Sequence, residues 1–218
     1  PNPIDALFET VSGFTTTGSS ILTDVEVLPH CILIWRSFTH WIGGMGVLVF
    51  LLSLLPLAGG YHMNLMKAES PGPSVSKLVP KVQDTAKILY TIYIGMTLLQ
   101  IVLLLLGRIP LFDTLCISFG TAGTGGFGIV NDSMGSYSVY CQIITTIFMI
   151  LFGVNFSAYY LFLTKKFMQA FKFEEVRYYF GIILAAIVII AFNTSHLFRN
   201  LGEAFQQAAF QVGSIITT

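Results

Sequence analysis

The sequence predicts an all-α membrane protein built from repeated units, each made of a membrane-spanning helix, a short half-helix, a polar loop and a second spanning helix. Three observations predict this fold class. Hydrophobic residues make up 54% of the 218 residues and charged residues only 10%, against about 25% charged in soluble domains. Long apolar stretches alternate with short segments rich in Gly, Thr and Ser. Those short segments resemble one another and recur along the chain.

The long apolar stretches are the candidate membrane spans, because a transmembrane helix needs about 20 mostly apolar residues. Arg36 and His40 interrupt the first stretch, whereas the second and third contain no charged residue. We therefore expect four spans, at residues 31–57, 88–107, 136–164 and 178–196.

Three short segments lie between the spans, at residues 3–22, 110–130 and 200–218. The first opens with proline and acidic residues, which suit a helix N-terminus, and then runs into TTTGSS. The second repeats this plan as PLFDTLCISFG followed by TAGTGGFG, and the third ends where its polar run begins. Matching the Thr/Gly runs gives offsets of 107 and 202 residues, which indicates an internal repeat. We expect three units, at 1–87, 88–173 and 174–218.

The charged residues predict how the chain is oriented. Seven of the eleven acidic residues lie in the loops that carry the half-helices, where an acidic surface would concentrate cations. Basic residues in loops mark the cytoplasmic side, so the half-helices are expected to enter from the outer face. The net charge of zero gives no argument for nucleic acid. Eight of the eleven basic residues lie in two loops: Lys67, Lys77, Lys81, Lys87, Lys165, Lys166, Lys172 and Arg177.

The chemistry of the short segments favours ion conduction over catalysis. Irregular backbone at membrane depth is tolerated where it is buried in protein or lines a water-filled path. A half-helix that descends from outside directs its negative dipole end at such a path. The Thr/Gly run then supplies carbonyl groups, with freedom for positive φ at Gly18 and Gly125, as in a potassium filter. We find no constellation of a nucleophile, a base or metal ligands, so we do not expect an enzyme.

Four motifs resemble the TrkH/KtrB/HKT superfamily of potassium transporters: DALFETVSGFTTTGSS (5–20), WRSFTHWIGGMGVLVF (35–50), KAESPGP (67–73) and GTAGTGGFG (120–128). The stretch after Gly60 is more similar to TrkH than to KtrB. The resemblance implies four helix, pore-loop, helix repeats around a central ion pore, so this chain is expected to be part of a longer protein. It also implies potassium uptake across the bacterial inner membrane by a homodimer, with a cytosolic nucleotide-binding partner of the TrkA type and no cofactor besides the transported K⁺.

The same resemblance implies which residues form the filter. Each repeat contributes one glycine, and the carbonyl groups just before it line the ion path. Carried over by position, the expected K⁺ filter consists of Thr16, Thr17, Gly18, Gly123, Thr124, Gly125, Thr217 and Thr218.

Several alternatives stay open. Arg36 is expected either to pair with a loop acid such as Glu9 and brace the filter or to extend to the outer interface. His40 is expected as a packing residue, and Gly43 to Gly46 as a site of close helix approach or a bend. Asn155 is expected to face the pore or to form an interhelical hydrogen bond.

The function also has alternatives. The same architecture fits a sodium-selective or non-selective cation transporter, and a protein of another class, a non-conducting membrane scaffold, is the remaining hypothesis. Whether transport is passive or coupled to H⁺ or Na⁺ is left open by these residues.

Overall fold

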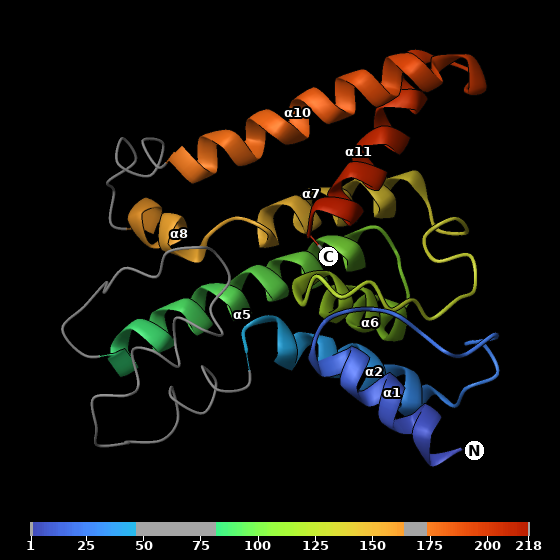
Figure 1. Ribbon diagram of the computed structural model, residues 1–218, viewed down its shortest axis with the longest axis vertical. Coiled ribbons are helices and arrows are strands. Elements are labelled where there is room, and N and C mark those ends of the chain that lie inside the picture. The colour runs from blue at the N-terminus through green and yellow to red at the C-terminus, as the bar shows by residue number, and fades with distance from the viewer. Residues whose placement is uncertain (1, 47–81, 164–173, 218) are drawn as a thin grey trace.

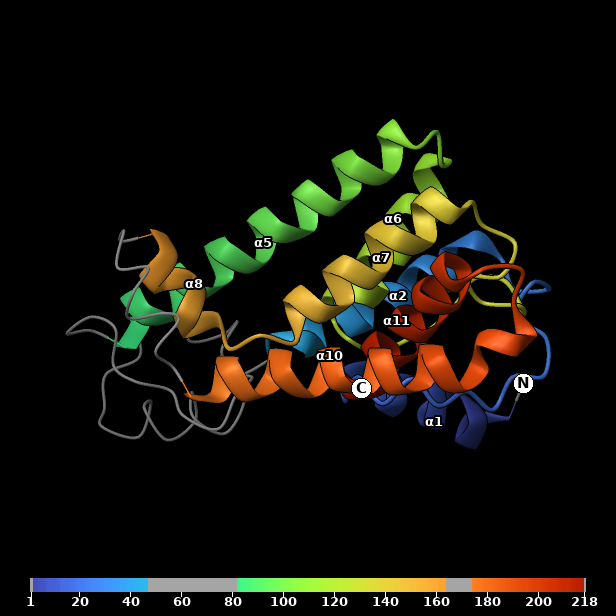
Figure 2. The ribbon, with the colours of Figure 1, turned by 90° about the horizontal axis from the view of Figure 1, so that it is seen from above.

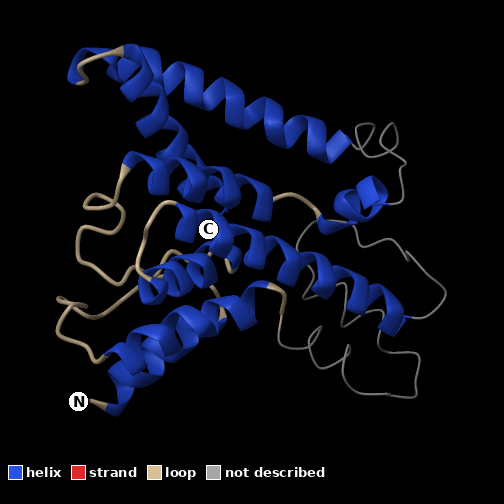
Figure 3. Ribbon diagram, turned by 180° about the vertical axis from the view of Figure 1, so that it is seen from behind, coloured by secondary structure: helices blue, strands red, loops and turns tan. Residues whose placement is uncertain are grey.

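The computed structural model describes residues 2–46, 82–163 and 174–217, and the regular structure in these ranges is entirely helical (Figure 3). This confirms the predicted all-α fold class. Thr218, motif 67–73, the second half of the first predicted span and most of the two basic loops lie outside the described residues. The elements, in chain order, are α1 (Pro3–Phe14), α2 (His30–Gly44), α5 (Val82–Leu106), α6 (Leu111–Ala122), α7 (Val139–Phe152), α8 (Phe156–Leu163), α10 (Glu174–Thr194), the 3₁₀-helix η1 (Ser195–Leu197) and α11 (Leu201–Thr217).

Among the described residues, two single helices are long and apolar enough to cross a membrane, at Ala86–Leu106 and Glu174–Leu197. They confirm the predicted spans at 88–107 and 178–196. The 25 residues of α5 extend about 37 Å at 1.5 Å per residue, which exceeds the roughly 30 Å hydrocarbon core of a bilayer.

The predicted span at 136–164 is not one straight helix, which corrects the sequence prediction. Helix α7 ends at Phe152, and α8 begins at Phe156 with its axis turned by 95°. The break has a hydrogen-bonding reason, because Asn155 Oδ1 accepts from the Ser157 backbone N–H at 2.9 Å and caps α8. The hydroxyls of Tyr159 and Tyr179 donate to carbonyl groups in the last turns of α7, at 2.6 and 3.0 Å. Backbone groups released by the break are thereby paired.

Asn155 also joins two helices, since its Nδ2 donates to Glu175 Oε2 of α10 at 3.2 Å. The interhelical hydrogen bond was one of the two predicted alternatives for this residue. It is confirmed, in a turn between helices and not in mid-helix.

The three half-helices begin as the sequence predicts. Asn2 caps α1 by accepting from the Ile4 N–H at 3.1 Å, and proline follows it at the first helical position. Helix α6 follows Pro110 and carries Asp113 in its first turn. The Asn200 side chain accepts from the Glu203 N–H at 2.8 Å at the start of α11. Polar caps of this kind satisfy backbone donors that have no partner within the helix.

The helices are arranged along the longest axis of the molecule (Figure 1). Helices α1 and α2 lie at one end and α10 at the other, with α5, α6 and α7 between them (Figure 1). In both views α7 lies between the long helices α5 and α10 (Figure 2). The core between α5, α7 and α8 is aromatic, with Tyr93 packed edge-on against Phe152 and Phe156.

All three half-helices belong to the same side of the molecule. The connections α1–α2, α6–α7 and α10–α11 lie together at one end, opposite the first turns of α5 and α10 (Figures 1 and 2). The chain therefore forms consecutive units of similar layout. The predicted unit boundaries at 87/88 and 173/174 stay predictions. Helix α5 begins at Val82, a few residues before the first of them.

Candidate functional site

The polar loops after α1 and α6 share one backbone conformation. We call residues 15–22 the first loop and residues 123–130 the second loop. Thr16 has φ 54° and Gly18 φ 72° in the first loop, and Thr124 has φ 51° and Gly126 φ 83° in the second. A threonine with positive φ is rare and strained. Its occurrence at the same step of both loops is strong evidence that they are structural equivalents.

The hydrogen bonds give the same register. Helix α1 closes with Thr15 N–H to Val11 O and Thr17 N–H to Ser12 O, and α6 closes with Gly123 N–H to Phe119 O and Gly125 N–H to Gly120 O. Each bond in the second loop therefore lies 108 residues after its counterpart.

The offset of 107 residues and the positive φ expected at Gly125 are consequently wrong by one position. Gly18 corresponds to Gly126, and Thr17 corresponds to Gly125. The sequence segment GTGG has two adjacent glycines, and a comparison of letters alone does not show which of them takes positive φ. The positive φ predicted for Gly18 is confirmed.

The two loops contact one another directly. A Cβ atom on Gly18 would overlap the carbonyl oxygen of Gly125. Gly18 is thus required both by its positive φ and by the closeness of the neighbouring main chain. Of the predicted filter residues, Gly18 and Gly125 are in direct contact. The filter role of Thr16, Thr17, Gly18, Gly123, Thr124 and Gly125 stays a prediction.

The third segment is less complete. Thr217 is the last residue of α11, and its hydroxyl donates to Gly213 O within the helix at 2.7 Å. By the predicted offset of 202 residues it corresponds to Thr15, which caps α1. Thr218 lies outside the described residues, so a filter role for this pair stays a prediction.

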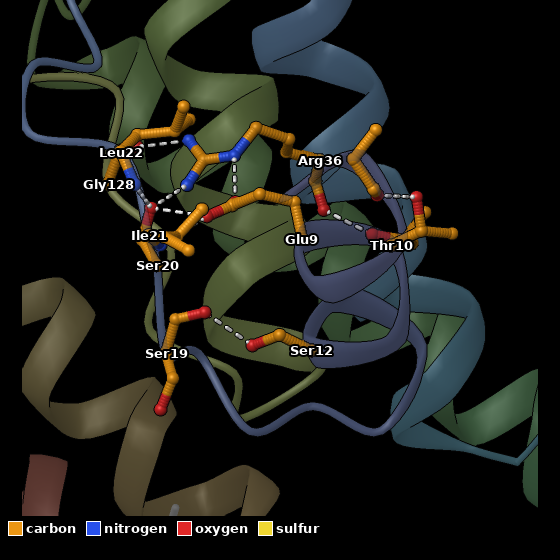
Figure 4. A network of polar contacts seen from close by, with 11 residues as sticks. Glu9, Thr10, Ser12, Ser19, Ser20, Ile21, Leu22, Arg36 and Gly128 are labelled. Carbon is orange, nitrogen blue, oxygen red and sulfur yellow. Dashed lines mark hydrogen bonds and ion pairs between the residues drawn. The ribbon is translucent and has the colours of Figure 1, made fainter. Parts of the chain in front are cut away.

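Arg36 braces the first loop, as one of the two predicted alternatives had it (Figure 4). Its Nε lies 3.1 Å from Glu9 Oε2, and the two side chains are only 6% and 11% exposed. The other carboxylate oxygen of Glu9 accepts from the Ser20 hydroxyl at 2.6 Å and from the Ile21 N–H at 2.7 Å. Arg36 Nη2 also donates to the Ser20 hydroxyl at 3.3 Å. The alternative, extension of Arg36 to the outer interface, is wrong.

Arg36 also reaches the second loop. Its Nη1 donates to Gly128 O at 3.4 Å, and its Cζ lies 4.1 Å from the centre of the Phe127 ring. His40, one helical turn further along α2, stacks on the same ring with centroids 4.1 Å apart. One face of α2 therefore contacts both loops, which sequence reasoning missed. A possible signal was the i, i+4 spacing of Arg36 and His40 in an otherwise apolar span.

The glycines at the end of α2 allow close approach, as predicted. A Cβ on Gly43 would overlap the Phe14 carbonyl oxygen at the end of α1, and a Cβ on Gly44 would lie within 2.5 Å of Gly123 Cα. The end of α2 is thus inserted against both half-helix ends.

A second connection joins the segments that directly follow the two loops, and the sequence analysis also missed it. Asn131 Oδ1 accepts from the Val25 N–H at 3.0 Å, its Nδ2 donates to Asp24 Oδ1 at 2.8 Å, and its N–H donates to Glu26 Oε1 at 2.9 Å. We call these residues the outer clamp. The hydrogen bond from Asn131 and one from the Glu26 N–H keep the pKa of Asp24 below its usual value.

The second loop borders a cavity of about 100 Å³. Thr124 and Gly126 of the loop, Thr145 of α7, and Ser214 and Thr217 of α11 contribute to its wall. No charged residue lines it. The second and third polar segments therefore meet across this space.

The ligands that the site offers to a cation are oxygens of the main chain and of hydroxyl groups. In the described ranges, no three His, Cys, Asp or Glu side chains gather where they could hold a metal ion. Cys31, Cys116 and Cys141 are free thiols. Oxygen ligands of this type suit hard cations.

Comparisons with known proteins agree with the geometry. A family model described as TrkH, cation transport protein, matches residues 2–198. The Trk system potassium uptake protein TrkH of Salmonella typhimurium is 34% identical over 219 residues, covering 98% of this chain and 45% of that protein. The TrkG protein of Escherichia coli, named likewise, is 34% identical over 218 residues, with the same coverage.

A solved structure leads to the same family. The crystal structure of the potassium transporter TrkH from Vibrio parahaemolyticus superposes with a TM-score of 0.80 at 29% identity, over 99% of this chain and 44% of that one. The chain thus spans less than half the length of the relatives it matches. These relatives are transport proteins and not enzymes, as expected from the residues.

Proposed function

Because the chain belongs to the TrkH family of cation transport proteins, we propose that it is part of a potassium uptake protein that conducts the ion through a filter of main-chain carbonyl groups. One observation carries the proposal. Two half-helices from separate repeats end in loops of the same strained conformation, and these loops touch at Gly18 and Gly125. Packing alone does not require that a threonine adopt the strained left-handed backbone conformation at the same position of both loops.

The proposed filter replaces the hydration shell of K⁺ with carbonyl oxygens. Thr16 and Thr17 supply them in the first loop, and Thr124 and Gly125 supply them in the second. Gly123 precedes them at the end of α6, and Thr217 and Thr218 are the proposed contribution of the third repeat. The C-terminal ends of α1 and α6 add negative dipole ends next to the loops, which stabilise a cation there.

The network around Arg36 supports a filter of defined geometry. Selection of K⁺ over Na⁺ depends on the number and positions of the coordinating carbonyl groups. The buried ion pair with Glu9 and the bonds to Ser20, Ile21 and Gly128 hold both loops at the point where each leaves the site. Loops that pack without conducting an ion would not need to be held in this way in both repeats.

The arrangement of the chain supports entry from the outer face of the bacterial inner membrane. Lys87 lies in the second turn of α5 and Arg177 in the first turn of α10, near the helix ends opposite the connections that carry the half-helices (Figure 1). The positive-inside rule assigns the end with the basic residues to the cytoplasm. Assembly as a homodimer and control by a TrkA-type nucleotide-binding subunit belong to the proposal through the family resemblance.

Rubidium uptake tests the proposal. The protein, expressed from its complete coding sequence in a bacterial strain without other potassium uptake, is compared with Gly18→Asp and with the control Gly95→Ala, whose site on α5 has open space. We expect uptake in the wild type and the control, and loss in Gly18→Asp at equal protein level. Competition by sodium distinguishes a potassium-selective protein, whose rubidium uptake resists sodium, from the sodium-selective or non-selective alternative. Uptake that survives in Gly18→Asp, or none in the wild type, would overturn the proposal, and the second result would favour a scaffold.

A further inference from the structure

His40 occupies the space directly behind the second loop. Its side chain is fully buried, and the ring stacks on Phe127 with an interplanar angle of 21°. Arg36 approaches the same Phe127 ring and donates to the next carbonyl group, that of Gly128. The imidazole is thus confined between α2 and the part of the loop that follows Gly125.

Position 125 requires a glycine because the His40 ring leaves no room for a side chain there. Its φ is not positive, unlike that of Gly18 and Gly126, so its backbone conformation is open to any residue. The three atoms nearest to a Cβ at this position are all ring atoms of His40: Nδ1, Cγ and Cε1. The side chain of the first repeat thereby decides how close the main chain of Gly125 lies to α2.

Gly123 has a different neighbour. A Cβ there would overlap the carbonyl oxygen of His40, which is main chain. Any residue at position 40 presents this oxygen, so the restriction at Gly123 is independent of the imidazole. The two glycines, two residues apart, therefore separate the effect of the His40 side chain from the effect of the helix that carries it.

The ring acts by its shape. Among the described residues, none hydrogen-bonds to either ring nitrogen. A buried imidazole without partners contributes contacts and volume but no directed bond. The contacts it does make are with Phe127 and with the main chain of the second loop.

We propose that His40 is a positioning residue of the second loop, whose imidazole ring sets the distance of the Thr124 and Gly125 carbonyl groups from the ion path and so contributes to the selection of K⁺ over Na⁺. This inference rests on the proposed filter function. It differs from that function in assigning the geometry of the second loop to a side chain of the first repeat.

Paired substitutions test the inference in the complete protein. Gly125→Ala is expected to lower rubidium uptake by about tenfold or more, because the added methyl group overpacks the site. His40→Ala is expected to lower the rubidium-to-sodium preference by roughly threefold to tenfold, since the loop loses its rear contact. In the double variant Gly125→Ala/His40→Ala, the methyl group occupies space left by the ring, and both quantities should return toward wild-type values.

Gly123→Ala is the matched control. It is expected to lose uptake as Gly125→Ala does, and His40→Ala should not restore it, because the overlapping atom belongs to the main chain of residue 40. Protein level and thermal unfolding in detergent are measured for every variant. If His40→Ala alone is unstable, the double variant still decides the question, since it refills the vacated volume.

Rescue of Gly125→Ala without rescue of Gly123→Ala supports the inference. Failure of that rescue in a stable protein overturns it, and so does rescue of both glycine variants, which would indicate a general loosening. An unchanged rubidium-to-sodium preference in His40→Ala also overturns it. Failure of the proposed function would give different results. In that case Gly18→Asp would transport like the wild type, or the wild type would not transport at all.

Discussion

In the first loop, Glu9 and Arg36 of the same repeat form a buried ion pair that holds Ser20 and Ile21 beside α1. The second loop has the same backbone conformation but no such pair. At the position corresponding to Glu9, 108 residues later, stands Ile117, which lines the cavity. The second loop is held from the neighbouring repeat instead, through Gly128 and Phe127.

This difference shows that two loops of the same backbone conformation can be held in place by different contacts. The turn itself has local features in both loops, namely the half-helix end and a glycine that accepts positive φ, Gly18 or Gly126. The contacts that keep it in place come from α2, which serves both loops (Figure 4). Substitutions in α2 should therefore affect two repeats, whereas substitutions in a loop should affect mainly one.

The largest effect is expected from Arg36→Gln. It leaves the buried Glu9 carboxylate without its cation, and breaking a buried pair from one side costs about 3–5 kcal/mol. It also removes the bond to Gly128, so both loops lose support. Thermal unfolding in detergent and rubidium uptake should both fall sharply. The double variant Glu9→Gln/Arg36→Gln, which removes the uncompensated charge, should recover part of the stability, and no recovery would contradict the pairing.

A smaller effect is expected from adding a methyl group at the equivalent glycines. Gly18→Ala meets both a positive φ and the Gly125 carbonyl oxygen, whereas Gly126→Ala meets a positive φ in open space. Backbone strain of this kind costs about 1–3 kcal/mol. Gly18→Ala should therefore reduce uptake much more than Gly126→Ala. Equal losses would show that the contact between the loops is unimportant.

The outer clamp should matter less. Asn131→Ala removes the two side-chain hydrogen bonds that join the repeats at an exposed surface, and each such bond contributes about 0.5–1.5 kcal/mol at most. The main-chain hydrogen bond from residue 131 to Glu26 remains. We expect a loss of roughly 1 kcal/mol in unfolding free energy, with faster hydrogen exchange at Val25 and with uptake nearly unchanged. Gln142→Ala, which removes hydrogen bonds to Met134 and Tyr137 and one from Gln206 of α11, is a comparison that leaves the clamp intact.

The smallest effect is a pH dependence of the outer clamp. The pKa of Asp24 is lowered in the folded protein, chiefly by Asn131. A lowered pKa means that the carboxylate stabilises the fold above its unfolded pKa of about 3.9 and that this contribution is lost as the pH falls through the folded value. Between pH 5 and 8 the clamp should thus be constant. Unfolding temperatures of the wild type and Asp24→Asn should differ there and converge below about pH 4. A constant difference would contradict this role of the carboxylate.

Much of the fold could be predicted because apolar run length directly reports a bilayer-spanning helix. The runs at 88–107 and 178–196 each correspond to one helix. The break at Gly153 to Asn155 could not be predicted, since it depends on capping by Asn155 and on hydroxyl groups of Tyr159 and Tyr179. These partners come together only after the chain has folded.

The candidate site shows the same division. An arginine in an apolar span calls for a buried partner, so the pairing with Glu9 was within reach of the sequence. The register of the second loop was not, because Gly125 and Gly126 are chemically identical and differ only in φ. The role of His40 also escaped prediction, since it depends on the approach of a loop 85 positions further along the chain.

The central claim is that the two touching loops bind a permeating cation with their main-chain carbonyl groups. Crystals of the complete protein grown in rubidium, with anomalous diffraction recorded at the rubidium edge, test it most directly. We predict anomalous peaks beside the carbonyl oxygens of Thr16 and Thr17 and of Thr124 and Gly125, and their loss in Gly18→Asp. Rubidium bound elsewhere, with none between these loops, would contradict the account.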